Sequence, residues 1–207
     1  MKTTVLQSSE PDALKITYET LKAGHLAAFP TDTVYGLAAD AFNEDAIQQL
    51  FEAKGRDFNK AIAVLVGDLK QAFLLTDELP DTAKILINNF WPGGLTLIVG
   101  KLANLPPSLS PSTSIGIRMP DHPLALTLLA KYGPLATTSA NISGGKNPQT
   151  AADVLAQLDG RIPLILDGGA CKGGVPSTVV DCTRSPIAIV RYGAVSETAI
   201  NKALKIG

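Results

Sequence analysis

Hydroxyl-bearing side chains gather where a short apolar run of this sequence ends. The run, residues 26–29, has the character of a buried strand, and it is followed by residues 30–37 (PTDTVYGL), where Thr31, Thr33 and Tyr35 each carry a hydroxyl. Ligands of α/β sheets bind at the carboxyl ends of strands, and a glycine there lets a ligand approach the backbone. The segment therefore indicates a ligand-binding loop, although a proline-initiated turn whose hydroxyls cap its own backbone would use the same residues.

Cations cluster a little further along the chain. Lys54, Arg56 and Lys60 lie between an expected helix and an expected strand at residues 62–66. Lys and Arg at the mouth of a strand suit a triphosphate or a bicarbonate ion, and we expect Lys54 and Arg56 to lie at a polar rim. Cations at the end of a helix also complement its dipole without binding any ligand.

A lone arginine ends another expected strand, at residues 115–118. Arg118 follows Ser114 by four positions and lies two positions before Pro120. The planar guanidinium group of arginine can bind a carboxylate through two parallel hydrogen bonds. A solvated arginine at a strand end is the alternative.

A second hydroxyl-rich strand exit lies at residues 137–144 (TTSANISG), and Asn147 continues that loop. By itself the string is typical of a polar turn. Together with residues 30–37 and with Arg191 near the end of the chain, it could complete a receptacle for an anionic ligand. A surface charge is the alternative for Arg191.

Apolar periodicity predicts alternating helices and strands. The expected helices are residues 12–23, 43–53, 69–73, 81–90, 123–131, 151–158 and 197–205. The expected strands are residues 26–29, 62–66, 95–99, 115–118, 135–138, 163–166, 178–180 and 187–190. The stretch after residue 37 has helical character. This order predicts a layered α/β fold with a twisted mixed sheet flanked by helices, in one domain of residues 1–207.

Composition excludes several classes of function. A net charge of −1 provides no overall field that would attract nucleic acid or membrane, and no apolar stretch reaches membrane-spanning length. Two cysteines without a CxxC spacing and two separated histidines make a metal site or a histidine-based catalytic triad improbable, and the sequence has neither a GxxxxGK[ST] nor a GxGxxG loop. We expect a cytoplasmic protein with reduced cysteines.

The motifs together resemble the threonylcarbamoyl-AMP synthase family, the YrdC-type domain, in its short single-domain form. The resemblance runs in order through nearly the whole chain, and its motifs are residues 30–37, Lys54-Gly55-Arg56, Ser139-Ala140-Asn141, residues 176–181 (PSTVVD) and Arg191-Tyr192-Gly193. This sequence departs from the family pattern at Asp57, where proline is usual, and at Leu65, where histidine is frequent, so that only the backbone of Leu65 could serve.

The resemblance implies that threonine, bicarbonate and ATP are converted to threonylcarbamoyl-adenylate and pyrophosphate, with Mg²⁺ carried mainly on the ATP phosphates. The residue roles that it implies are Lys54, Arg56, Ser139 and Asn141 in catalysis, Arg56, Lys60, Ser114, Ser139, Asn147 and Arg191 in ATP binding, and Thr33, Leu65, Arg118, Thr137 and Ser177 in threonine binding. No residue is assigned as a general base or as a metal ligand.

The resemblance also implies partners. A downstream tRNA threonylcarbamoyl transferase complex would consume the adenylate, and related domains suggest weak binding of tRNA or double-stranded RNA, but no membrane partner. One alternative is a non-catalytic RNA-binding module of the same fold, against which the net charge argues. Another is a relative of the same fold that acts on a different small molecule.

Overall fold

Ten strands form one sheet in the computed structural model, which describes residues 2–205. The strands are β1 (Thr4–Gln7), β2 (Ala27–Phe29), β3 (Gly36–Asp40), β4 (Ala63–Leu65), β5 (Leu95–Gly100), β6 (Ser114–Arg118), β7 (Leu135–Ser139), β8 (Leu164–Asp167), β9 (Thr178–Asp181) and β10 (Ala188–Arg191). They lie in the order β1-β8-β2-β3-β7-β4-β6-β5-β9-β10. Some neighbours are parallel, such as β4 and β6, and others are antiparallel, such as β3 and β7. The predicted mixed sheet is therefore confirmed.

The helices coincide closely with those expected from apolar periodicity. They are α1 (Ala13–Lys22), α2 (Glu44–Lys54), α3 (Leu69–Ala72), α4 (Asp81–Phe90), α5 (Pro123–Tyr132), α6 (Ala151–Leu158) and α7 (Glu197–Leu204). Their starts have physical causes. The Asn43 side chain accepts a hydrogen bond from the Ala46 amide at the start of α2, and Thr150 and Asp153 form a reciprocal capping box at the start of α6.

The stretch after residue 37 is not helical, contrary to our expectation. It forms β3, which lies between β2 and β7 near the middle of the sheet. Its alanines favour a helix when considered alone. However, Ala38 and Ala39 are fully buried in the two apolar cores on opposite faces of the sheet, and this packing outweighs their intrinsic preference. The sequence prediction also missed β1 and a short 3₁₀ turn, η1 (Pro107–Leu109), within a proline-rich loop.

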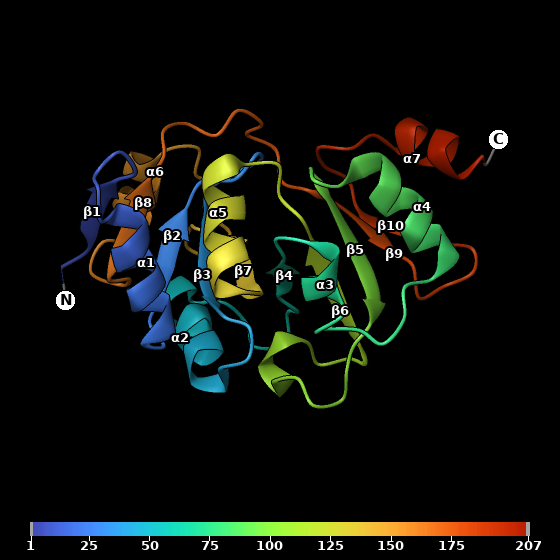
Figure 1. Cartoon of the computed structure of the whole chain (residues 1–207), viewed down its shortest axis with the longest axis horizontal. Helices are drawn as coiled ribbons and strands as arrows, with labels where there is room; N and C mark the ends of the chain where they lie inside the picture. Colours follow the sequence, from blue (N-terminus) through green and yellow to red (C-terminus); the bar gives the residue numbers. More distant parts are fainter. Residues whose placement is uncertain (1, 206–207) are drawn as a thin grey trace.

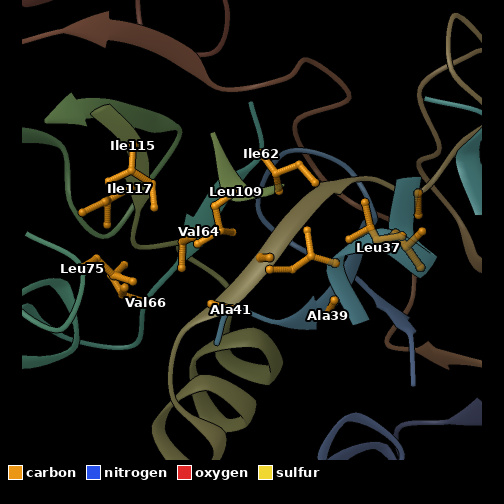
Figure 2. Close-up of a cluster of buried hydrophobic side chains, with 14 of the residues drawn as sticks. Leu37, Ala39, Ala41, Ile62, Val64, Val66, Leu75, Leu109, Ile115 and Ile117 are labelled. Atoms are coloured by element: carbon orange, nitrogen blue, oxygen red, sulfur yellow. The ribbon is translucent and has the colours of Figure 1, made fainter. Parts of the chain in front are cut away.

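Two apolar cores lie on opposite faces of the sheet. One core takes Val64, Ile115 and Ile117 from the strands, together with the buried faces of α2, α4, α6 and α7, and Figure 2 shows part of it. The other core takes buried residues of α1 and α5, which lie beside β2, β3 and β7 in Figure 1. Side chains alternate along a strand. The strand neighbours of Val64, Ile115 and Ile117, such as Leu65 and Gly116, therefore point toward this second face.

The second face is covered only in part. In the described chain, the helices α1 and α5 cover this face over the half of the sheet that contains β1. Residues of β4, β5, β6 and β9 that point to the same face line a cavity instead. None of the helices within residues 2–205 combines the length and the apolar character that crossing a membrane requires.

Candidate active site

A cavity of about 310 Å³ lies on this open part of the sheet. Strand pairing brings distant motifs together at its wall. Gly36 of β3 pairs with Ser139 of β7, and Ala63 of β4 pairs with Thr137 of β7. The residues 30–37 and the residues 137–144 therefore meet because two antiparallel strands end and begin beside one another.

Most of the residues predicted for the site line this cavity. They are Thr33, Arg56, Leu65, Arg118, Thr137, Ser139, Asn147, Ser177 and Arg191. They come from segments spread over almost the whole sequence, and the order of the strands explains their convergence.

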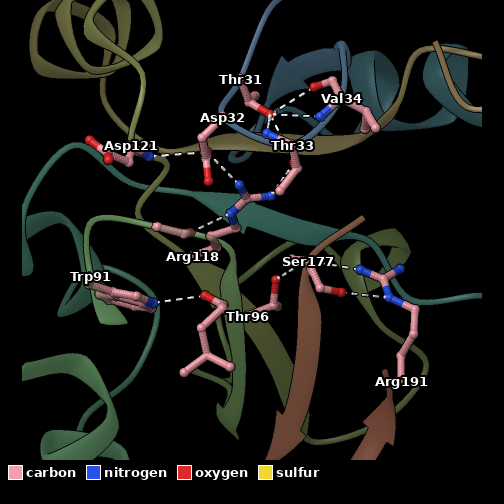
Figure 3. Close-up of polar contacts among 12 residues, drawn as sticks. Thr31, Asp32, Thr33, Val34, Trp91, Thr96, Arg118, Asp121, Ser177 and Arg191 are labelled. Carbon is pink, nitrogen blue, oxygen red and sulfur yellow. Dashed lines mark hydrogen bonds and ion pairs between the residues drawn. The ribbon is translucent and has the colours of Figure 1, made fainter. Parts of the chain in front are cut away.

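Arg118 is held by three hydrogen bonds, which Figure 3 shows. Its Nε donates to the Gly93 carbonyl oxygen at 2.9 Å, Nη1 donates to Thr33 Oγ1 at 2.9 Å, and Nη2 donates to Asp32 Oδ1 at 2.5 Å. A guanidinium group has five N–H donors, so two remain for a ligand. Arg118 is 6% exposed, and burial lowers its pKa while the carboxylate of Asp32 opposes that shift.

The threonines of residues 30–37 build a tight turn beside Arg118. Thr31 Oγ1 donates to the Val34 carbonyl oxygen at 2.7 Å and lies 3.0 Å from Thr33 Oγ1. Both hydroxyls are buried. The two readings of this segment are therefore compatible, because Thr31 caps the turn while Thr33 faces the cavity and orients Arg118.

Two further arginines border the cavity. Arg191 donates from Nε to the Ser177 carbonyl oxygen at 3.0 Å and from Nη2 to Ser177 Oγ at 2.9 Å, and Ser177 Oγ lies 2.8 Å from Thr96 Oγ1 (Figure 3). Arg56 donates from Nη2 to the Ala61 carbonyl oxygen at 2.9 Å, while its buried Nε has no partner within the described residues.

The charges of these arginines act on one another across the cavity. Burial and then the charge of Arg191 lower the pKa of Arg56, and the same charge also lowers that of Arg118. Among the described residues that line the cavity, none is an aspartate or a glutamate. The wall therefore presents cations and hydroxyls, which suit carboxylate and phosphate ligands.

Lys54 does not lie at a polar rim, contrary to our expectation. It is 1% exposed, and its Nζ donates to the carbonyl oxygens of Ser139 and Asn141 and, at 3.3 Å, to Asn141 Oδ1. The reason lies in helical spacing, since Ile47 and Phe51 precede Lys54 by seven and three positions on the buried face of α2. Lys54 and Asn141 lie outside the cavity wall, and their contacts hold the loop that carries Ser139.

Two other predicted residues also lie outside the cavity wall. Lys60 is exposed in the loop between α2 and β4. Ser114 begins β6, at the opposite end of that strand from Arg118, and shares a hydrogen bond of 2.9 Å with Ser112. Proximity in sequence placed Lys60 with Arg56, but only Arg56 lines the cavity.

The cavity wall includes residues that the sequence prediction missed. Thr96 is the only polar side chain of β5 and was hidden in an apolar strand, although a single hydroxyl in such a run was a usable signal. Gly36 and Gly116 also line the cavity. A Cβ atom at Gly36 would lie 2.7 Å from Thr137 Cγ2, and one at Gly116 would lie 3.2 Å from Thr96 Cγ2, so both glycines keep room on the cavity face.

The two cysteines lie outside the cavity wall. Cys171 and Cys182 are free and buried, as expected, and burial raises the pKa of the Cys171 thiol to about 11 and that of Cys182 to about 12. Within residues 2–205, no group of three His, Cys, Asp or Glu side chains is placed to hold a metal ion.

Known proteins are similar to this chain in sequence and in fold. A family model described as telomere recombination (Sua5_yciO_yrdC) matches residues 19–193. The threonylcarbamoyl-AMP synthase of Bacillus subtilis (strain 168) is 44% identical over 190 residues, which cover 89% of this chain and 54% of that relative. The chain thus spans about half the length of the Bacillus protein.

Two further matches extend these similarities. A putative threonylcarbamoyl-AMP synthase of Mycobacterium tuberculosis (strain ATCC 25618 / H37Rv) is 40% identical over 187 residues, which cover 90% of this chain and 86% of that relative. The crystal structure of Pyrococcus abyssi Sua5 complexed with L-threonine superposes with a TM-score of 0.94 at 36% identity, covering 98% of this chain and 61% of that one.

Proposed function

The chain belongs to the Sua5/YciO/YrdC family, and on that premise we propose that it is an L-threonylcarbamoyladenylate synthase. The enzyme converts L-threonine, bicarbonate and ATP to threonylcarbamoyl-AMP, pyrophosphate and water. The observation that carries the proposal is the cavity, where the buried Arg118 and two further arginines meet several hydroxyls without any carboxylate in the described wall. The names of the curated relatives and the threonine-bound relative support the same reading.

The threonine site centres on Arg118 in this proposal. Its two free N–H donors bind the carboxylate of threonine, because a guanidinium group matches the two oxygens of a carboxylate. Thr33 and Ser177 supply hydroxyls beside it, and Thr137 and Leu65 complete this part of the wall.

The nucleotide site lies around the other two arginines. Arg56 has most of its donors free, including the buried Nε, and faces the cavity with Ser139 and Asn147. Arg191 is shared, since it already binds Ser177. We assign the phosphates of ATP to Arg56 and Arg191, and the carbamate to the neighbourhood of Ser139.

The chemistry needs two bond-forming steps. The amine nitrogen of threonine, after losing a proton, attacks the carbon of bicarbonate and releases water, which gives a carbamate. A carbamate oxygen then attacks the α-phosphorus of ATP, and the bond to pyrophosphate breaks. Both steps are accelerated mainly by alignment and by stabilising negative charge, so that a protein nucleophile is unnecessary.

Mg²⁺ enters this proposal with the nucleotide. The described cavity wall offers hydroxyls and cations rather than the carboxylate oxygens that Mg²⁺ prefers, so the residues do not form a cage for the ion. Bound to the phosphates, Mg²⁺ neutralises part of their charge.

The product needs an acceptor. In our proposal a tRNA threonylcarbamoyl transferase complex takes the threonylcarbamoyl group from the adenylate. The alternative, an RNA-binding module without turnover, is less well supported, because the curated relatives carry the name of a synthase.

Release of pyrophosphate tests the proposal. The purified protein should release pyrophosphate only when ATP, L-threonine, bicarbonate and Mg²⁺ are all present, and Arg56→Ala should reduce the rate by about 10²-fold or more. Lys22→Ala, which removes an exposed lysine of α1, is the matched control and should keep full activity. Equal release without threonine would overturn the assignment.

A further inference from the structure

Asp32 lies behind Arg118 and outside the cavity wall. Its Oδ1 accepts from Arg118 Nη2 at 2.5 Å and from the backbone amide of Asp121 at 3.1 Å. The side chain of Asp32 is 17% exposed and that of Arg118 is 7% exposed. The ion pair is thus largely withdrawn from water. Its geometry is therefore better defined than that of an ion pair on the surface.

Asp32 is itself fixed from two sides. The Asp121 amide belongs to the segment that leads into α5, and it fixes the carboxylate. On the other side the backbone of Asp32 packs against Gly173, where an added Cβ would lie only 2.6 Å from the Asp32 carbonyl oxygen. Next to it, the amide of Gly174 donates to the Thr33 carbonyl oxygen at 2.8 Å. The carboxylate therefore has a rigid base from which to orient a neighbour.

The orientation of Arg118 depends on this carboxylate. The other two bonds of the guanidinium group reach uncharged acceptors, the Gly93 carbonyl oxygen and the Thr33 hydroxyl. All three bonds have a charged donor, but only the bond to Asp32 also has a charged acceptor, which makes it the strongest of the three. Three bonds from three directions fix the plane of the guanidinium group and hence the direction of its two free donors.

Asp32 also supplies the local counter-charge. Among the described residues, the pair with Asp32 is the only salt bridge made by an arginine of the cavity wall. Arg191 adds a second positive charge near Arg118. Without Asp32, a buried guanidinium group would face another arginine with no compensating carboxylate bound to it.

We infer that Asp32 is a positioning residue, which holds the Arg118 guanidinium so that its two free donors meet the carboxylate of the amino-acid substrate. The inference rests on the proposed function for the identity of that substrate. It adds a residue that touches neither threonine nor ATP but sets the affinity for threonine alone.

The test compares Asp32→Ala and Asp32→Asn with Asp121→Asn. Asp121→Asn is the matched control, because it removes a nearby exposed carboxylate and keeps the backbone amide that binds Asp32. By calorimetry, Asp32→Ala should weaken L-threonine binding by about 10- to 100-fold, as expected when a binding group is misdirected. Asp32→Asn retains an acceptor oxygen and should lose less, while Asp121→Asn and the ATP affinity of all three variants should stay near wild type.

The outcomes separate this inference from the proposed function. Equal threonine affinity in wild type and in a folded Asp32→Ala variant would overturn the positioning role, as would an equal loss of ATP and threonine binding. If Asp32→Ala does not fold, the Asp32→Asn variant decides by the same criteria. Absence of threonine binding by the wild type would refute the proposed substrate instead.

A spectroscopic measurement needs no substrate. In ¹⁵N spectra of the arginine side chains, slowly rotating Nη groups of Arg118 should give separate signals in wild type and in Asp121→Asn. These signals should collapse in Asp32→Ala. Persistence of the separate signals in a folded Asp32→Ala variant would contradict the inference whatever the reaction.

Discussion

Replacing Lys54 by methionine tests how the loop that carries Ser139 is held. The change keeps an unbranched side chain in the core but removes the amino group of a residue that is only 1% exposed. Asn141 O and Asn141 Oδ1 then lose their donor, whereas Ser139 O still accepts from the Asn141 amide, and a buried acceptor left without a partner costs about 1–3 kcal/mol. Removing a buried charge offsets part of this loss. We expect the free energy of unfolding to fall by about 2–4 kcal/mol at pH 7, measured by urea denaturation.

The dependence of that loss on pH gives a sharper readout. Burial and then the charge of Arg56 lower the pKa of Lys54 from its ordinary value of 10.5 to about 7. Between these pKa values the unfolded chain binds one proton more than the folded protein, so the contribution of Lys54 to the free energy of unfolding rises with pH. At about 1.4 kcal/mol per pH unit, the rise from pH 7 to pH 9 is about 2 kcal/mol. The gap between wild type and Lys54→Met should widen by this amount.

Urea titrations of both proteins at several pH values from 6 to 9 provide the measurement. Burial also raises the pKa of the Cys171 and Cys182 thiols, which lowers stability as the pH rises, but it does so equally in both proteins and cancels in the difference. A constant gap across this range would refute the lowered pKa of Lys54. Equal stability of the two proteins at every pH would refute our account of the loop.

Three further changes probe the cavity wall. Gly36→Ala places a Cβ 2.7 Å from Thr137 Cγ2, so it should cost about 1–3 kcal/mol of stability and weaken threonine binding in calorimetry. Arg191→Ala should weaken ATP binding and also threonine binding, because Arg191 donates to both oxygens of Ser177. An unchanged affinity for threonine would show that this contact does not contribute to threonine binding. Arg118→Lys keeps the charge but loses the planar fork, so the KM for threonine should rise by about 10-fold or more while that for ATP stays near wild type; a selective rise for ATP would move Arg118 to the nucleotide site.

Strong local signals made most of the fold predictable from the sequence. Apolar residues at helical spacing gave the bounds of α4 and α6, and the Asn43 cap gave the start of α2. β3 was missed because its alanines carry no strand signal of their own, and only burial between β2 and β7 makes them extended. Tertiary packing decides such a segment, and a single sequence does not display it.

The candidate site was predictable where polar residues follow strand ends. Thr33, Arg118 and Ser139 line one cavity because strand pairing places those ends side by side. The position of Lys54 was not foreseen, although its helical spacing from Phe51 carried the signal. The support that Asp32 gives to Arg118 depends on contacts between distant segments, which residue types alone do not reveal.

A ¹³C label in bicarbonate tests the central claim most directly, that threonine, bicarbonate and ATP combine in one adenylate. The protein is incubated with ATP, L-threonine, Mg²⁺ and ¹³C-bicarbonate, and the adenylates formed are identified by mass spectrometry. We predict one adenylate that contains both threonine and the ¹³C atom, formed together with pyrophosphate. A threonyl-adenylate without ¹³C, or hydrolysis of ATP with no adenylate at all, would contradict the account.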